Sequence, residues 1–365
     1  MPDNSLGYYL GFSYFLGIGP IRFRNLINYF GSIELAYQAR EKELINVLGA
    51  LTGKKFIDFR NNFSSTKELK ILHDKSIGIV TQNDSRYPVA FKNLSDPPIC
   101  LFVKGDLKKW NLQETKYFIG IVGTRKPTSY GLQITNRLAR ELSDLGFVIV
   151  SGLALGIDAA AHQAALTAKG KTIAFLGCGV DIPYPRENIK IYDQIIASGG
   201  LIISEFPPGR LVQKGLFIAR NRLISGLSAG VLVVEGMKDS GSLVTARFAA
   251  EQGKTVFAPP SPITSVMSEA PNLLLKQGAR LVTSIDDILS EFEITIDPTK
   301  IDRWKNKLSR KEILIVDSLL KESLLVDEIV LLTGLPAETI LNLLSQMEIK
   351  GIVGRNDDGK YRIEA

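Results

Sequence analysis

Short, continuous apolar runs recur through the middle of the chain, and they limit its fold more than any other feature. The runs are Phe118–Val122, Phe147–Val150, Thr172–Leu176, Leu201–Ile203, Val231–Val234 and Thr255–Phe257. A turn containing Gly, Ser or Pro follows each run, and helical patterns separate the runs. Strands that are apolar along their whole length are buried on both faces. The pattern therefore predicts an α/β domain over residues 71–290, built on a doubly wound, mostly parallel sheet.

The first 70 residues are predicted to form a helical domain. The turn Leu16-Gly17-Ile18-Gly19-Pro20 lies between two amphipathic stretches and resembles a helix-hairpin-helix or SAM-like element. Two glycines in such a turn let the backbone approach a phosphate. An ordinary tight turn that only packs explains the same residues, so both interpretations stand. Strands are expected to follow at Ile77–Val80 and Ile99–Val103.

The C-terminal part of the chain is predicted to be a separate winged-helix domain over residues 309–365. Residues 291–308 are charged, contain Pro298 and are interpreted as a linker. Helices are expected at Ser309–Leu320, Val326–Leu332 and Pro336–Ile349, with a hairpin around Asn356–Gly359. The third helix has no Lys or Arg before Lys350. Protein docking is therefore favoured over groove reading, because helices that read DNA carry basic residues.

Composition excludes several kinds of site. The formal net charge of +6 permits a polyanionic partner but does not require one. Cys100 and Cys178 lie far apart, and the histidines are only His73 and His162, so neither a disulfide framework nor a metal site is predicted. No cofactor is expected. No apolar run is long enough to cross a bilayer, and we expect a cytoplasmic protein without membrane insertion.

The turns after the apolar runs carry residues suited to binding an anion. Gly123-Thr124-Arg125 directly follows a run and precedes a helical pattern, which predicts free backbone N–H groups beside a planar guanidinium. Small and hydroxyl residues recur at Ser151–Gly156 and at Ser240–Ser242, and Arg220-Asn221-Arg222 precedes the fifth run. Ligands of parallel sheets bind at the carboxyl ends of the strands. Several such turns around one sheet predict a phosphate pocket.

Three enzymatic signatures fail on spacing or context. Gly177–Ile182 lacks the third glycine of a dinucleotide fingerprint, and no Walker A sequence is present. Ser228 lies in a G-x-S-x-G sequence that precedes a strand, whereas a hydrolase nucleophile follows one.

Asp158 and His162, four residues apart, share a helical face and have the spacing of an acid–base pair. We favour a structural role, in which Asp158 orders the preceding turn and His162 packs with a hydrogen bond behind it.

Two glutamates end apolar runs inside the predicted pocket. Glu205 and Glu235 are expected to order the basic side chains of Arg220 or Arg222, because carboxylates in an anion site either pair with its cations or repel ligands.

Longer segments resemble one protein family. These segments are IVGTRKPTSYG, VSGLALGIDAAAH, TIAFLGCGVDIPYP, LIISEFPPG, ARNRLISGLS and VLVVEGMKDSGSLVTARFAAEQGKTVFAPP. In order and spacing they resemble the DprA/Smf family of DNA-processing proteins, closely over residues 77–290 and in architecture at both ends. The resemblance implies a Rossmann-like domain that binds single-stranded DNA, forms a homodimer and helps to load RecA recombinase during natural transformation. It implies no catalysis, cofactor or metal.

Carried onto this chain, the resemblance implies a set of DNA-binding residues. They are Gly123, Thr124, Arg125, Ser151, Gly152, Gly156, Arg220, Asn221, Arg222, Lys238, Ser240, Gly241 and Ser242. Phe217 is the candidate for stacking on a base, although a core position is favoured for this side chain. The chain departs from the family pattern at Pro259-Pro260 and at Ala270-Pro271, which follow the last apolar run. The resemblance therefore does not predict the shape of the pocket on this side.

Two other functions stay open beside a non-enzymatic single-stranded-DNA-binding protein. The Gly-rich turns also resemble those of nucleotide phosphoribohydrolases of the lysine-decarboxylase-like group, which would make the chain a nucleotide-binding enzyme. Those enzymes carry a P-G-G-x-G-T-x-x-E stretch, and Ser240–Thr245 lacks its paired glycines and its spaced glutamate. The third alternative is a module that mainly docks proteins through its winged helix.

Overall fold

The 365-residue chain forms two compact units, Met1–Glu293 and Ile294–Ala365, in its computed structural model. The structure describes residues 5–292, 308–319, 322–349, 352–356 and 359–363. Most of the predicted linker, together with Lys350, lies outside these residues. Within the described ranges no single helix is long and apolar enough to cross a membrane, although the bent pair Val326–Thr333 and Ala337–Glu348 reaches that length and composition together.

A mostly parallel sheet forms the centre of the first unit. Its strands in chain order are β1 (Gly78–Thr81), β2 (Cys100–Lys104), β3 (Phe118–Val122), β4 (Val148–Ser151), β5 (Thr172–Phe175), β6 (Leu201–Ser204), β7 (Gly230–Val233), β8 (Thr255–Ala258) and β9 (Arg280–Leu281). They lie in the order β1-β2-β6-β5-β4-β3-β7-β8-β9. From β6 to β9 all neighbours are parallel, whereas β2 runs antiparallel to both of its neighbours, β1 and β6, near one edge. The predicted mostly parallel sheet is confirmed.

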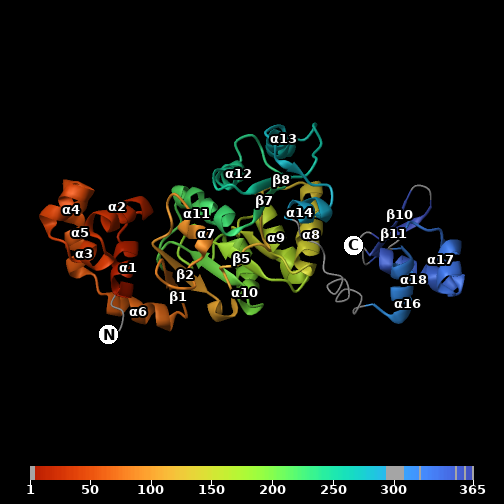
Figure 1. Ribbon diagram of the computed structural model, residues 1–365, viewed down its shortest axis with the longest axis horizontal. Helices are drawn as coiled ribbons and strands as arrows, with labels where there is room; N and C mark the ends of the chain where they lie inside the picture. The colour runs from red at the N-terminus through yellow and green to blue at the C-terminus, as the bar shows by residue number, and fades with distance from the viewer. Residues whose placement is uncertain (1–4, 293–307, 320–321, 350–351, 357–358, 364–365) are drawn as a thin grey trace. The chain divides into compact units, whose positions relative to one another are not determined.

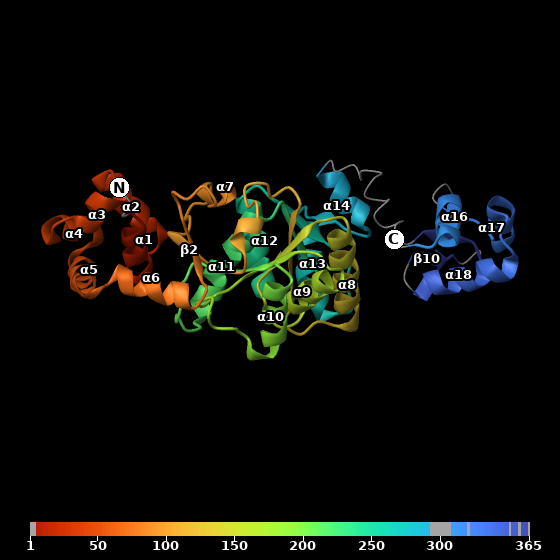
Figure 2. The same ribbon diagram turned by 90° about the horizontal axis from the view of Figure 1, so that it is seen from below.

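Helices cover both faces of the sheet (Figures 1 and 2). One layer consists of α8 (Ser129–Asp144), α9 (Ile157–Thr167) and α10 (Ile189–Ala197), and the other contains α11 (Lys214–Leu227) and α12 (Gly241–Glu251). Shorter elements complete the unit: α7 (Val89–Lys92), α13 (Glu269–Lys276), α14 (Ile285–Glu291) and the 3₁₀ turns η1 (Leu107–Lys109), η2 (Arg186–Asn188) and η3 (Val266–Ser268). The central strands are fully buried, which explains their continuous apolar sequence.

The sheet reverses its winding direction between β3 and β7. From β3 the chain moves outward through β4, β5 and β6, and after α11 it returns to β7 on the other side of β3. Both strands run parallel to β3, so their carboxyl ends lie at the same edge. A ligand crevice forms at such a topological switch point.

The N-terminal segment consists of short helices that share a core with the sheet. They are α1 (Ser5–Tyr14), α2 (Pro20–Phe30), α3 (Ile33–Gln38), α4 (Glu41–Leu48), α5 (Ala50–Asn62) and α6 (Ser65–Asp74). Phe12 stacks on Phe56 with ring centroids 5.2 Å apart, and Tyr14 meets Phe102 of β2 edge-on at 6.1 Å. One apolar cluster joins these helices to β2, β5, β6 and α10. The boundary predicted at residue 70 stays a prediction.

The second unit contains three helices and a two-stranded hairpin. These are α16 (Arg310–Leu319), α17 (Val326–Thr333), α18 (Ala337–Ile349), β10 (Val353–Arg355) and β11 (Tyr361–Ile363). The strands pair antiparallel. A separate core is formed by Ile315, Ile329, Leu344, Val353 and their neighbours. The expected helices and hairpin are present within one or two residues of their predicted bounds.

Candidate nucleic-acid interface

A pocket of about 830 Å³ opens at the switch point of the sheet. Its walls come from the turns after β3, β4 and β7, from the N-terminal turns of α12 and from one face of α11. Its lining includes these residues of the predicted set: Gly123, Thr124, Arg125, Arg220, Asn221, Ser240, Gly241, Ser242 and Phe217. The segments after β5 and β6 also contribute to the lining, with Tyr184 and Val212 respectively.

The turn after β3 is held in place by backbone contacts. The Thr124 N–H donates to the Glu235 carbonyl at 2.8 Å, and the Ile157 N–H donates to the Thr124 carbonyl at 3.1 Å. Gly156 has φ +79°, and a Cβ there would lie 2.4 Å from the Thr124 oxygen, so only glycine permits this approach. Arg125 is exposed and lines the pocket. Gly156 therefore shapes the pocket without lining it.

The helix that follows this turn does not offer a free N-terminus. Thr128 caps α8, and both its backbone N–H and its hydroxyl donate to the buried Glu235 carboxylate, at 2.9 and 2.6 Å. An internal anion therefore occupies the position that the sequence suggested for a phosphate. The sequence predicted that Glu235 orders Arg220 or Arg222. It instead orders the N-terminus of α8.

The N-terminus of α12 faces the pocket instead. Ser240 is its N-cap and accepts from the Ser242 N–H at 3.3 Å, while the two hydroxyls lie 2.8 Å apart. Asn221 on α11 donates to the Gly241 carbonyl at 3.3 Å and joins the two walls. Backbone N–H groups, hydroxyls and the positive end of a helix dipole are suited to a phosphate.

Arg220 supplies a buried positive charge beneath the pocket. Its Nη1 donates to the carbonyls of Gly152, at 2.6 Å, and of Phe175. The guanidinium lies so close over Gly152 that a Cβ would be 2.3 Å from Nη1. Burial lowers the pKa of Arg220 to about 10, and the Asp158 carboxylate partly offsets this, so the group is charged at neutral pH.

Asp158 and His162 have structural roles, as favoured from the sequence. Asp158 accepts from the backbone N–H groups of Gly152, at 3.1 Å, and Ala154, at 3.4 Å, and so orders the turn after β4. His162 Nδ1 lies 2.6 Å from the Thr172 hydroxyl and its ring is fully buried. Burial first, then the charge of Arg220, lowers the pKa of His162 to about 3, so the ring is neutral at pH 7.

Arg222 does not line the pocket, although the sequence places it in the set. Its side chain is 4% exposed and binds Glu205 through two nitrogens, at 2.6 and 2.7 Å, and Asp96 at 2.8 Å. Both carboxylates raise the pKa of Arg222, and burial opposes them. Since the guanidinium is saturated by internal anions, Arg222 anchors α11 and is not free to bind phosphate. The prediction that a glutamate orders one of the two arginines is right for Glu205 and Arg222.

An aromatic face borders the basic side of the pocket. Phe217 on α11 is half-buried, and its ring lies 5.6 Å from that of Tyr184 and 5.7 Å from the Arg125 guanidinium carbon. Gly177 lets α11 approach β5, because a Cβ there would lie 2.8 Å from Phe217. Phe217 therefore lines the pocket and is not the core residue that was favoured.

The remaining predicted residues lie beside the pocket. Ser151 is buried, and its hydroxyl donates to the Ile121 carbonyl at 2.6 Å. This hydroxyl therefore connects β4 to β3 and does not face the pocket. Gly152 lines an adjoining recess of about 50 Å³. Lys238 is exposed next to the lining residues Met237 and Asp239.

Sequence reasoning missed several lining residues, among them Lys126, Tyr184, Lys214 and Asp239. Lys126 directly follows the predicted turn, and Tyr184 lies in the quoted segment ending in IPYP, so both were within reach of the same argument.

Comparison with known proteins identifies the family. The family model of DNA recombination-mediator protein A matches residues 78–293, more than half of the chain. The chain belongs to this family. Among its relatives, Protein Smf of Synechocystis sp. is 33% identical over 99% of this chain and 100% of its own length. DNA processing protein DprA of Bacillus subtilis is 44% identical over 61% of this chain and 74% of its own. The DprA/Smf resemblance of the motifs is confirmed.

Solved structures of the family agree with the fold. DprA from Streptococcus pneumoniae matches with a TM-score of 0.67 at 33% identity, covering 80% of this chain and 98% of that protein. DprA from Helicobacter pylori matches with a TM-score of 0.52 at 38% identity, covering 59% of this chain and 94% of that protein. The study of the latter concerns the single-stranded DNA binding mode of that protein.

Proposed function

We propose that this chain binds single-stranded DNA and holds its phosphates in the pocket at the switch point. The observation that carries the proposal is the convergence of Arg125, Arg220 and the N-terminus of α12 on one cavity. Each is suited to an anion, and Arg125 lies far along the chain from the other two. Membership of the family, and the DNA binding studied in the H. pylori relative, support the same ligand.

The phosphate ligands of this proposal are fewer than the sequence suggested. Arg125 and Arg220 supply the charges, Gly123 and Gly241 supply backbone N–H groups, and Thr124, Ser240 and Ser242 supply hydroxyls. Phe217, with Tyr184 behind it, provides a face on which a base stacks, with tolerance of its sequence. Arg222, Ser151 and Gly156 position these groups without touching DNA.

The test is a titration of the full chain with a fluorescent oligonucleotide, single-stranded or duplex, at two salt concentrations. We expect the single strand to bind more tightly and its affinity to fall steeply with salt, because phosphate contacts release counterions. Equal affinity for duplex, or binding that salt does not weaken, would contradict the proposal.

We propose that the pocket does no chemistry. Among the described residues that line it there is no glutamate to match the one in the phosphoribohydrolase signature, and Asp158 is committed to backbone N–H groups. Incubating the protein with nucleoside monophosphates and measuring release of free base separates the two functions. Base release above a control with Arg125→Gln would revive the enzyme.

Family membership also supports proposals about the protein's partners, its N-terminal helices and its C-terminal unit. We propose that the protein is a homodimer and helps to load RecA recombinase during natural transformation, in the cytoplasm. We also propose that the N-terminal helices are a helix-hairpin-helix or SAM-like domain and that the C-terminal unit is a winged helix used for docking proteins. In that unit α18 carries Glu338 and Glu348 and no basic residue, which favours a protein partner over a DNA groove.

A further inference from the structure

A second, smaller groove lies where the N-terminal helices meet the sheet unit. It has a volume of about 160 Å³. One wall is the hairpin between α1 and α2, and the other runs from Phe206 to Leu216. Leu16, at the rim, is 65% exposed, and the groove also contains the half-buried rings of Phe15 and Phe206. The groove is thus largely apolar and aromatic.

This groove is connected to the large pocket by a shared segment of chain. Residues 206–218 contribute Phe206, Pro207, Arg210 and Leu216 to the groove, and Val212, Lys214, Phe217 and Ile218 to the pocket. Leu211, between the two sets, is 70% exposed. A strand that fills the pocket therefore meets the groove on crossing a single loop and the first turn of α11.

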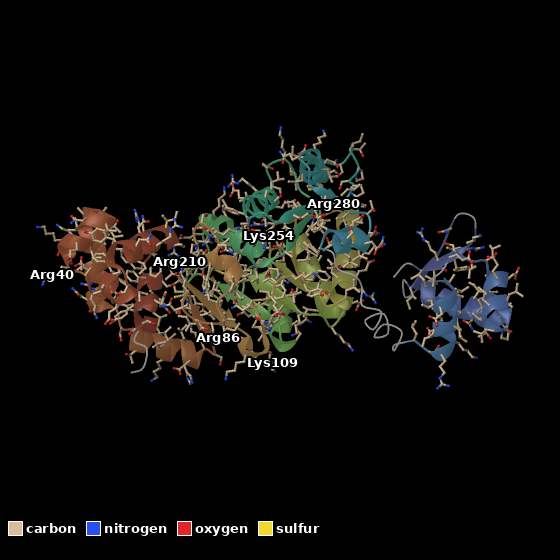
Figure 3. The ribbon with its side chains drawn as sticks, viewed as in Figure 1. Arg40, Arg86, Lys109, Arg210, Lys254 and Arg280 are labelled. Atoms are coloured by element: carbon tan, nitrogen blue, oxygen red, sulfur yellow. The ribbon has the colours of Figure 1, made fainter. Side chains whose placement is uncertain are left out.

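The shared segment carries positive charge that no anion neutralises in the part of the chain that the structure describes. Arg210 bonds to the Gln213 side chain at 2.8 Å and, like Lys214, has no ion pair among the described residues. Figure 3 shows Arg210 between the N-terminal helices and the sheet unit. Glu205 also lines the groove, but its charge is held by Arg222. The segment between the pocket and the groove therefore presents the basic side chains of Arg210 and Lys214, and the groove itself presents aromatic rings.

We infer that a single DNA strand leaving the large pocket crosses residues 210–214 and places a further nucleotide in the groove beside the Leu16–Pro20 hairpin. This inference rests on the proposed function and enlarges its footprint. Arg210 and Lys214 pair with successive phosphates, while Leu16, Phe15 and Phe206 pack against the base and sugar. The N-terminal hairpin then contributes an apolar wall rather than glycine N–H groups.

Oligonucleotide length separates this inference from the function on which it rests. We would titrate the full chain with oligothymidylates of about 5 and about 15 nucleotides, since the shorter can fill only the large pocket. The variants are Arg210→Gln and Leu16→Ala, with Arg40→Gln as the matched control. Arg40 is exposed at the outer side of the N-terminal helices, away from the groove (Figure 3).

We expect both groove variants to bind the short oligonucleotide like the wild type, which also shows that they are folded. Each should bind the long one about threefold to tenfold more weakly, and Arg210→Gln should reduce its salt slope by about 0.7. Arg40→Gln should change neither. Unchanged long-oligonucleotide affinity in both variants would overturn the inference and leave the pocket intact. Failure of the wild type to bind either oligonucleotide would overturn the proposed function and this inference together.

Discussion

Three arginines near the pocket show how the surroundings of a side chain decide its role. Arg125 is exposed beside Phe217, Arg220 is buried over Gly152, and Arg222 is enclosed by carboxylates. The sequence presents Arg220 and Arg222 as equivalent. They differ because α11 points them in different directions, and because Asp96, one of the two carboxylates around Arg222, lies 126 residues away in the chain.

Replacing Arg222 should destabilise the protein strongly. In Arg222→Met the Glu205 carboxylate is left buried without its partner, which costs about 3–5 kcal/mol of unfolding free energy. Urea unfolding measures the loss. Arg247→Met is the control, because Arg247 pairs with Glu251 on the surface and should cost less than about 1 kcal/mol. Equal losses in the two variants would contradict the anchoring role.

His162 should make stability depend on pH. Its pKa is about 3 in the folded protein, against 6.5 for an unperturbed ring. Between these pH values the ring is protonated in the unfolded chain and neutral in the folded one. Stability is full above about pH 6.5 and is lost as pH falls toward 3, by about 1.4 kcal/mol per unit once the unfolded ring is protonated. Urea midpoints between pH 7 and 5 should fall less in His162→Gln than in the wild type. Parallel curves would show that the ring is not buried neutral.

At the scale of elements, two helix N-termini near the pocket have different uses. The end of α8 is occupied by Glu235, and the end of α12 is open to the cavity. A phosphate bound in the pocket should therefore depend on α12 and not on α8.

Removing each N-cap tests this difference. Ser240→Ala and Thr128→Ala each delete a capping hydroxyl and should cost about 1 kcal/mol of stability. Only Ser240→Ala should also weaken binding of single-stranded DNA, because Ser240 lines the pocket. Urea unfolding and oligonucleotide titration of both variants provide the comparison. A comparable loss of DNA affinity in Thr128→Ala would count against the assignment.

The central strands could be predicted because strands buried on both faces have continuous apolar sequences. The order of the strands, and the antiparallel edge formed by β1 and β2, depend on long-range pairing that no local pattern records. β9 was missed because Arg280 and Leu281 form a two-residue, exposed edge strand. The pocket turns were found from their small residues, but the Glu235 cap over α8 joins residues more than a hundred positions apart.

The whole molecule consists of two units with separate cores. All lining residues of the pocket belong to the first unit. The N-terminal helices share one apolar cluster with the sheet, so they should unfold together with it.

A chain ending at residue 293 should therefore fold and keep its affinity for single-stranded DNA. The reason is that neither the pocket nor its supporting contacts use the second unit in the part of the chain that the structure describes. Circular dichroism and the oligonucleotide titration test the truncated chain. Loss of DNA binding in a truncated chain that still melts cooperatively would place part of the site in the second unit.

The most direct test of the phosphate pocket is the salt dependence of single-stranded DNA binding in Arg125→Gln, measured beside Arg137→Gln. Arg125 is exposed and lines the pocket, whereas Arg137 lies on α8 and pairs with Glu141. We predict that Arg125→Gln weakens binding and lowers the slope of log affinity against log salt by about 0.7, the share of one phosphate, with no change in Arg137→Gln. An unchanged slope in Arg125→Gln would show that the strand's phosphates do not lie in this pocket.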